Sequence, residues 1–424
     1  MTMSIRAIPD EVIRRKKMVI LVFGVMLYFL TSMAKVLIPG SIFNDLQQLG
    51  LNAAEISSTG AAFMYAYACS QIIAGVFSNR YGGVRILLIG GTLFAVGTIG
   101  FPLPCVNYPI MLICRMMAGL GAGTVFLGVV KLVNDLFSAK FGVVLGAIML
   151  CSYLGPTCGT TPMVMLVTCA GWRTAMLIPG IAAALEVTGI VLMMRGTIKP
   201  IQRGETVKPL LEMLKNREMW LLSMTSSIIF GSYYVLSSQI GSKSIADHSG
   251  LSMSTASAII MGMTIITALN NVGGNLLLKG FGGQRKVTAM AAFGTLFAGT
   301  LLGYCGFKFG HSVLLPAAGF VLIAYSAGFF PIFSLIAKEI NPPENVGLAI
   351  ALLNGWCFIF IAAFQNISGR ILKNYAPTDG TAYASAAYCA VFIFLIIAAG
   401  IGLAGSALYR ETSPAAAKGK TSLR

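Results

Sequence analysis

The stretch that decides the fold covers residues 75–85, GVFSNRYGGVR, a glycine-rich basic turn between two apolar runs. The runs on either side, at about 56–78 and 85–104, are long enough to cross a bilayer as helices, which takes about 20 mostly apolar residues. Outward from this turn, apolar runs and short polar connections alternate along the chain. The pattern predicts an all-α membrane protein with twelve transmembrane helices, at 18–39, 56–78, 85–104, 109–132, 142–168, 173–194, 219–241, 255–278, 286–306, 312–337, 346–369 and 383–408.

The composition also favours a membrane protein. Of the 424 residues, 56% are apolar and only 10% are charged, against about 25% charged residues in soluble domains. The net charge of +16 could suggest nucleic-acid binding, but the basic residues lie in short segments between the apolar runs. The positive-inside rule explains this distribution, so we expect the lipid bilayer, and not a nucleic acid, as the surrounding partner.

The lysines and arginines predict the topology. With the N-terminus in the cytoplasm, 22 of the 30 fall in cytoplasmic segments, five in outer loops, among them Lys243, and three inside spans. We therefore expect a multi-pass protein of the plasma (inner) membrane with a cytoplasmic N-terminus at 1–17 and a cytoplasmic tail at 409–424. The first apolar run is too long for a signal peptide and is interpreted as an uncleaved span.

A charged connection at 195–218 divides the chain into two six-helix bundles, at 18–194 and 219–408. The two bundles share sequence features: the turn at 80–85 has a counterpart at 280–285, GFGGQR, and the tetrapeptide GTLF occurs shortly after each turn. These echoes predict two pseudo-symmetric bundles that arose by duplication. Repeated halves with a binding site between them near the middle of the membrane are the usual plan of secondary transporters.

The turn at 75–85 resembles the signature of the major facilitator superfamily, in which a glycine, an acid, a basic residue, a second glycine and further basic residues follow at fixed spacing. Five residues occupy these positions: Gly75, Asn79, Arg80, Gly82 and Arg85. The resemblance implies a gating role, in which the turn latches the cytoplasmic ends of the two bundles. Because Asn79 stands in place of the acid, we expect a weaker latch that uses neutral hydrogen bonds.

Two further segments resemble motifs of the same superfamily. Residues 115–123, RMMAGLGAG, are similar to its span-four motif of an arginine followed by small residues, which permit close helix contact. Residues 155–159, GPTCG, are similar to its span-five glycine–proline motif, best known in proton-linked exporters. Importers carry similar sequences, so the motif does not determine the direction of transport.

Two cations inside the spans suggest the substrate. The resemblance implies that spans one, four, seven and ten line a central cavity, and Lys35 and Arg115 lie on two of these spans. Two cations facing one cavity would attract an anion. The alternative is that both side chains snorkel to the outer interface. Uncharged candidates for the substrate site, which could instead serve only packing, are Tyr28, Tyr233, Tyr234, Gln239 and Tyr325.

Two acidic residues have candidate roles in gating and coupling. Asp135 follows span four, where the resemblance implies an ion pair with Arg80 or Arg85 that helps to gate the inner side. Glu186 is the only acid deep in a span, and a carboxyl in hydrocarbon is more stable when protonated. Glu186 could therefore couple transport to protons, although span six usually packs outside the cavity, which favours a structural role.

Taken together, these features predict secondary active transport of a small organic anion by alternating access, with an ion co-transported or exchanged. Proton-coupled efflux of a metabolite or drug is the alternative, and a non-transporting membrane sensor is an alternative of another class. The chain has no HExxH, GxSxG or Walker sequence, so we expect neither an enzyme nor an ATP-driven pump. We expect no cofactor, no metal and a monomer.

Overall fold

The computed structural model describes residues 10–103, 107–198, 213, 215–273, 278–310, 312–342, 345–378 and 380–412, with side chains except at 72, 74–80, 139, 142, 143, 150–152 and 272. The described chain is helical almost throughout. The helices before the 195–218 connection are α1 (Asp10–Leu37), α2 (Phe43–Gln48), α3 (Ala53–Tyr81), α4 (Gly83–Gly100), α5 (Tyr108–Phe137), η1 (Ser138–Lys140), α6 (Phe141–Cys158), α7 (Thr161–Ala170) and α8 (Trp172–Met193).

A second set of helices follows the connection. They are α10 (Arg217–Val235), η2 (Leu236–Ile240), α11 (Gly241–Ser249), α12 (Met253–Val272), α14 (Arg285–Phe309), α15 (Leu314–Ala327), α16 (Phe330–Glu339), α17 (Val346–Lys373) and α18 (Ser385–Ser406). We refer to the helices from α1 to α8 as the N-terminal half and to those from α10 to α18 as the C-terminal half. Most of the predicted connection at 195–218 lies outside the described residues.

Most of the predicted spans are present as helices. In the described part of the chain, ten helices are long and apolar enough to cross a membrane, and α6 with α7 makes an eleventh if this bent pair is one span. Helix α3 has 29 residues, but the side chains of its last third lie largely outside the described set. Helices suit the bilayer because they satisfy their backbone hydrogen bonds internally.

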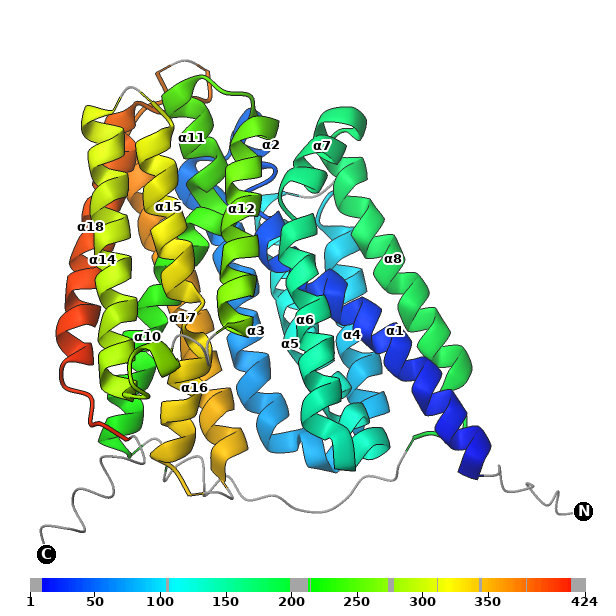
Figure 1. Cartoon of the computed structure of the whole chain (residues 1–424). Coiled ribbons are helices and arrows are strands. Elements are labelled where there is room, and N and C mark those ends of the chain that lie inside the picture. The colour runs from blue at the N-terminus through cyan, green and yellow to red at the C-terminus, as the bar shows by residue number, and fades with distance from the viewer. Residues whose placement is uncertain are drawn as a thin grey trace, which may run out of the picture.

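The two halves lie side by side, as Figure 1 shows, with α1, α4, α6 and α8 on one side and α14, α15 and α18 on the other. Helices α3 and α17 pack against each other where the halves meet. The first turn of α1 and the last turn of α18 lie at the same end, which we call the terminal end; α2 and α11 lie at the opposite end, which we call the α2 end (Figure 1).

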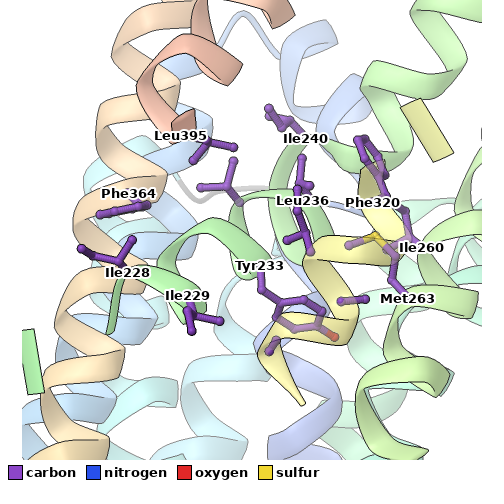
Figure 2. Close-up of a cluster of buried hydrophobic side chains, with 14 of the residues drawn as sticks. Ile228, Ile229, Tyr233, Leu236, Ile240, Ile260, Met263, Phe320, Phe364 and Leu395 are labelled. Atoms are coloured by element: carbon purple, nitrogen blue, oxygen red, sulfur yellow. The ribbon is translucent and has the colours of Figure 1, made fainter. Parts of the chain in front are cut away.

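The core of the C-terminal half gathers around α10 and the π-helical turn η2. Figure 2 shows Tyr233 and Leu236 beside apolar side chains from the neighbouring helices α12 and α15. This buried cluster continues into the N-terminal half through residues of the α2 end, including Phe43 and Leu46 on α2. The N-terminal half has a second cluster, which α17 joins. Apolar packing therefore connects the halves most completely toward the α2 end.

Two predicted spans are broken. The span predicted at 142–168 forms α6 and α7, which meet at an angle of 43°. The break follows Pro156, whose ring prevents a regular helical hydrogen bond. A Cβ at Gly155 would lie 2.7 Å from the carbonyl oxygen of Phe29, so this glycine lets α6 approach α1 closely. The span predicted at 312–337 is likewise interrupted, between α15 and α16.

Each of the two basic turns has a backbone position that favours glycine. Gly82, between α3 and α4, has φ +74° and ψ +152°, a conformation that essentially only glycine adopts. Gly283, just before α14, has φ +73°. The chain therefore reverses at a glycine after each of these two membrane helices, in agreement with the echo seen in the sequence.

The small residues at 115–123 provide the close helix contacts that the motif predicts. A Cβ at Gly119 would overlap the carbonyl oxygen of Phe63 on α3, and one at Gly121 would overlap that of Gly90 on α4. Helix α5 therefore touches both neighbours backbone to backbone, as small residues allow in membranes.

We expect Gly121→Val to destabilise the protein by about 1–3 kcal/mol, because α4 and α5 must separate to admit the side chain. The measurement is the midpoint of thermal unfolding in detergent. Gly294→Val is the matched control, since a Cβ there meets nothing within 4 Å. Equal midpoints for the two variants would show that the α4–α5 contact does not depend on glycine.

The assignment of Lys243 to an outer loop is wrong. The seventh predicted span continues through η2 into α11, and Lys243 lies on α11 with only 1% of its surface exposed. The polar sequence at 242–249 suggested a loop because hydropathy cannot register the partners that a folded protein brings to a buried polar group.

Candidate functional site

Lys35 lies in a cage of aromatic rings. Its Nζ donates a hydrogen bond to the hydroxyl of Tyr67 on α3 at 3.3 Å and lies 4.5 Å from the centre of that ring. The rings of Phe358 on α17 and Tyr28 on α1 complete the cage, at 5.3 and 5.9 Å. We call these four residues the Lys35 cage. The ammonium is buried, at 8% exposure, so it does not snorkel to the interface.

Lys35 has no acidic partner in the part of the chain that the structure describes. Its contacts there are the tyrosine hydroxyl and the three rings, and no carboxylate of the described residues lies within 4 Å of its Nζ. Cation–π contacts with rings contribute about 0.5–2 kcal/mol each. They offset only part of the several kcal/mol that removing an ammonium from water costs.

Tyrosines of the C-terminal half lie beside the cage. Tyr234 on α10 packs against the buried cluster that contains Tyr28, Tyr67 and Phe358. Its ring centre lies 5.2 Å from that of Tyr233, its neighbour on α10. Both halves of the molecule therefore contribute phenol hydroxyls, which can donate or accept hydrogen bonds, to the region around one buried ammonium.

Arg115, on α5, is buried against a different part of α3. Its Nε donates to the carbonyl oxygen of Thr59 at 3.1 Å, and its guanidinium lies over the ring of Phe63 at 4.4 Å. Thr59 and Tyr67 are eight residues apart on one helix, about 12 Å along its axis. The two cations thus contact α3 at different levels, and Arg115 holds α5 to α3 although one of its Nη atoms has no partner.

Two other predicted substrate-site residues, Gln239 and Tyr325, lie outside the Lys35 cage. Gln239, on η2, bonds across the halves, as described below. Tyr325 is near the end of α15, where its carbonyl oxygen accepts from Asn270 at 2.6 Å and its ring meets Phe329. No contact between Tyr325 and the Lys35 cage is present among the described residues.

Hydrogen bonds join the halves near the α2 end. Gln239 donates from Nε2 to the hydroxyl of Ser57 on α3 at 2.5 Å and to the carbonyl oxygen of Gln365 on α17 at 3.0 Å. The backbone of Gly40, just after α1, donates to the carbonyl oxygen of Ser238 on η2 at 2.9 Å. The π-helical turn is thereby held against the first, second and eleventh predicted spans.

Lys243 forms a second connection at the same end. Its Nζ lies 3.1 Å from Asp247 and donates to Asn44 on α2 at 2.9 Å and to the carbonyl oxygen of Thr381 at 2.7 Å. Asp247 also accepts from the backbone of Tyr383 at 3.0 Å. Burial raises the pKa of the Tyr383 phenol, which keeps its hydroxyl neutral. We use the name α2 clasp for the contacts of Lys243 and Asp247 described here together with the contacts of Gln239 described above.

Ion pairs described at the terminal end stay within one half. Asp135 lies 3.8 Å from Lys17 in the N-terminal half, and Arg285 lies 2.8 Å from Glu339 in the C-terminal half. Among the described side chains, Asp135 and Arg85 do not form the expected pair, and one Nη atom of Arg85 is buried there without a partner. Three predicted gating residues, Gly75, Asn79 and Arg80, lie in the segment whose side chains are outside the described set.

Glu186 faces away from the Lys35 cage. It lines a groove of about 360 Å³ between α1, α6 and α8, together with apolar side chains. One oxygen of its carboxyl is buried without a hydrogen-bond partner among the described residues. This position agrees with the expectation that span six packs at the periphery.

The fold and this buried polar centre can be compared with known proteins. A family model described as the Major Facilitator Superfamily matches residues 20–365. The chain belongs to the Major Facilitator Superfamily. It is therefore an integral, multi-pass membrane transporter, and the names of its relatives likewise indicate a transporter and not an enzyme.

Two relatives from this comparison illustrate the range of the superfamily. Over 179 residues the chain is 24% identical to "Choline/ethanolamine transporter FLVCR1" of Felis catus, covering 42% of this chain and 31% of that protein. Over 165 residues it is 25% identical to "Probable sulfoacetate transporter SauU" of Cupriavidus necator, covering 38% of each. The matched stretches thus span about a third of these relatives.

A solved structure of a bacterial homolog to the human lysosomal transporter Spinster, in an inward-facing and occupied conformation, superposes with a TM-score of 0.72 at 15% identity. The match covers 91% of this chain and 96% of that one. At this identity the likeness establishes the superfamily fold and nothing about the substrate.

Two residues of the Lys35 cage were not recognised from the sequence. Tyr67 and Phe358 lie on the second and eleventh predicted spans, which were not expected to line the cavity. The sequence offered one usable signal. Tyr65 and Tyr67 lie close together in an apolar run, and the hydroxyl of a tyrosine inside a span needs a hydrogen-bond partner.

Proposed function

We propose that this protein transports a small organic anion, which binds at the Lys35 cage. The observation that carries the proposal is the buried ammonium of Lys35, which has rings and a phenol around it but no acidic partner among the described residues. A buried charge is stabilised by an opposite charge in the same low-dielectric site. A carboxylate or sulfonate would supply that charge.

The surrounding groups favour an anion with hydrogen-bonding oxygens. Tyr28, Tyr67 and Tyr234 can each donate a phenol proton, and a charge-assisted hydrogen bond is about twice as strong as a neutral one. The similarity to a probable sulfoacetate transporter supports the same class of solute for this chain. A cationic solute would instead face the repulsion of Lys35.

We propose that transport follows alternating access, with the two halves as two six-helix bundles and with α3 completing the set of twelve spans. Because most lysines and arginines of the sequence lie in the connections assigned to the terminal end, we infer that this end faces the cytoplasm of a cell with an inner membrane. The α2 clasp then closes the outer side. Release of the clasp, as the halves rock about the cage, would open the site outward.

The remaining assignments belong to the same proposal. The segments 1–17, 195–218 and 409–424 would be cytoplasmic, the protein would act as a monomer, and a gradient of a co-transported or exchanged ion would supply the energy. The basic turn at 75–85 would latch the terminal end when the outer side is open.

The test is a thermal-shift screen of the purified protein in detergent. A ligand that binds the folded state raises the apparent stability. We expect sulfoacetate or small carboxylates to raise the unfolding midpoint of the wild-type protein, and Lys35→Gln to abolish that rise. A rise with choline or neutral sugars alone, or an anion effect that persists in Lys35→Gln, would contradict the proposal.

A further inference from the structure

The groove that contains Glu186 is separate from the Lys35 cage. It is formed by α1, α6 and α8 and has a volume of about 360 Å³, within the range of about 300–1,000 Å³ typical of small-molecule sites. Except for Glu186, its lining is apolar, with Met26, Phe29, Leu154 and Ala182 among its residues. The groove therefore combines one carboxyl group with an otherwise apolar lining.

The groove opens toward the bilayer. Met26 is 51% exposed and Leu154 is 58% exposed, and Leu185, next to Glu186, is 67% exposed. Large apolar side chains that are exposed on a membrane-spanning helix face lipid. Glu186 lies seven residues before the last residue of α8, about 10 Å along the helix from the terminal end. A molecule dissolved in that leaflet can reach it with its polar end.

The carboxyl of Glu186 lacks a counter-charge. No lysine, arginine or histidine lies within salt-bridge distance of it in the described part of the chain, and one of its oxygens is buried without a hydrogen bond. An acidic side chain inside a membrane is costly and usually marks a functional position. The neighbouring side chains on α1 and α6 cannot satisfy it, because they are apolar.

We propose that this groove binds a lipophilic amine, a molecule with an ammonium group and an apolar body, which enters from the bilayer. The ammonium would pair with Glu186, and the apolar body would lie against Met26, Phe29 and Leu154. Charge complementarity favours this occupant: an anionic amphiphile is repelled by the carboxylate, and a neutral amphiphile offers at most a hydrogen bond and no counter-charge. The site lies outside the central pathway and adds a second ligand class to the proposed anion transporter.

The test uses the full-length protein in nanodiscs of zwitterionic lipid. The probe is a dansyl-labelled long-chain primary amine, and the comparison probe has the same chain and label with an alcohol in place of the amine. We expect the amine to bind at least about 10-fold more tightly than the alcohol, and Glu186→Gln to remove this difference, as loss of a charge-assisted hydrogen bond implies. Leu185→Gln, which adds an amide at a lipid-facing position of the same helix, is the matched control.

A second variant tests the groove itself. Ala182→Phe fills the groove without changing the charge, and we expect it to weaken binding of both probes; it also decides the question if Glu186→Gln does not fold. Equal binding of amine and alcohol by the wild-type protein, or unchanged amine binding in Ala182→Phe, would overturn the proposal. The thermal response to anions reports separately on Lys35, so failure of one proposal leaves the other standing.

Discussion

Replacement of Lys35 by glutamine is expected to reduce uptake of the transported anion by at least about 30-fold. The loss corresponds to about 2 kcal/mol, the lower end of the range for removing one partner of a buried charge pair. Lys35→Arg keeps the positive charge and should retain part of the activity, limited by the fit of a larger group among three rings.

The measurement is uptake into proteoliposomes of the anion that gives the largest thermal shift. Lys308→Gln is the matched control, because Lys308 is an exposed lysine near the end of α14 that contacts Tyr304. We expect this control to transport at the wild-type rate. If Lys35→Gln transports as well as Lys308→Gln, the anion does not depend on the caged ammonium, and the site must be sought elsewhere.

Replacement of Lys243 by methionine should destabilise the protein by about 3–5 kcal/mol. Lys243 and Asp247 are 1% and 8% exposed, and removal of the lysine leaves a buried carboxylate without its counter-charge. The change also removes the bond from Lys243 to Asn44 on α2, which ties the two halves together. Replacing both members of the pair, in Lys243→Met with Asp247→Leu, should recover much of the loss.

The comparison for Lys243 is an exposed ion pair of the same kind. Arg410 lies 2.7 Å from Glu218, with 80% and 38% of the side chains exposed, and such pairs contribute about 0–1 kcal/mol. Unfolding midpoints of Lys243→Met and Arg410→Met should therefore differ clearly. Equal midpoints would mean that Lys243–Asp247 is not the stabilising element of the α2 clasp.

These two predictions address different parts of one cycle. In the proposed cycle, the Lys35 cage would select the solute and the α2 clasp would hold the two halves together at the α2 end. Helix α3 connects the clasp to the cage, because it carries both Ser57, which belongs to the clasp, and Tyr67, which belongs to the cage. A solute that changes the packing around Tyr67 could thereby favour one state of the clasp over the other, which is how a ligand shifts a conformational equilibrium.

The sequence by itself determined the membrane class, the superfamily and the approximate positions of most helices. The reason is physical: a bilayer requires about 20 consecutive apolar residues in each span, and turns such as Gly82 require a residue without Cβ. The glycines at 119 and 121 also predicted close helix contact, because small residues inside a span let the backbones of neighbouring helices approach each other. These features depend on neighbours along the chain.

Only the tertiary structure decided which polar groups meet. In a membrane helix both the lipid-facing and the protein-facing sides are apolar, so the periodicity that marks the inner face of a soluble helix is weak. The sequence therefore identified Lys35 but not its partners Tyr67 and Phe358, and it placed Lys243 in a loop although α2 and Asp247 bury it. The environment of a buried charge is set by residues that are distant in the chain, and only folding brings them together.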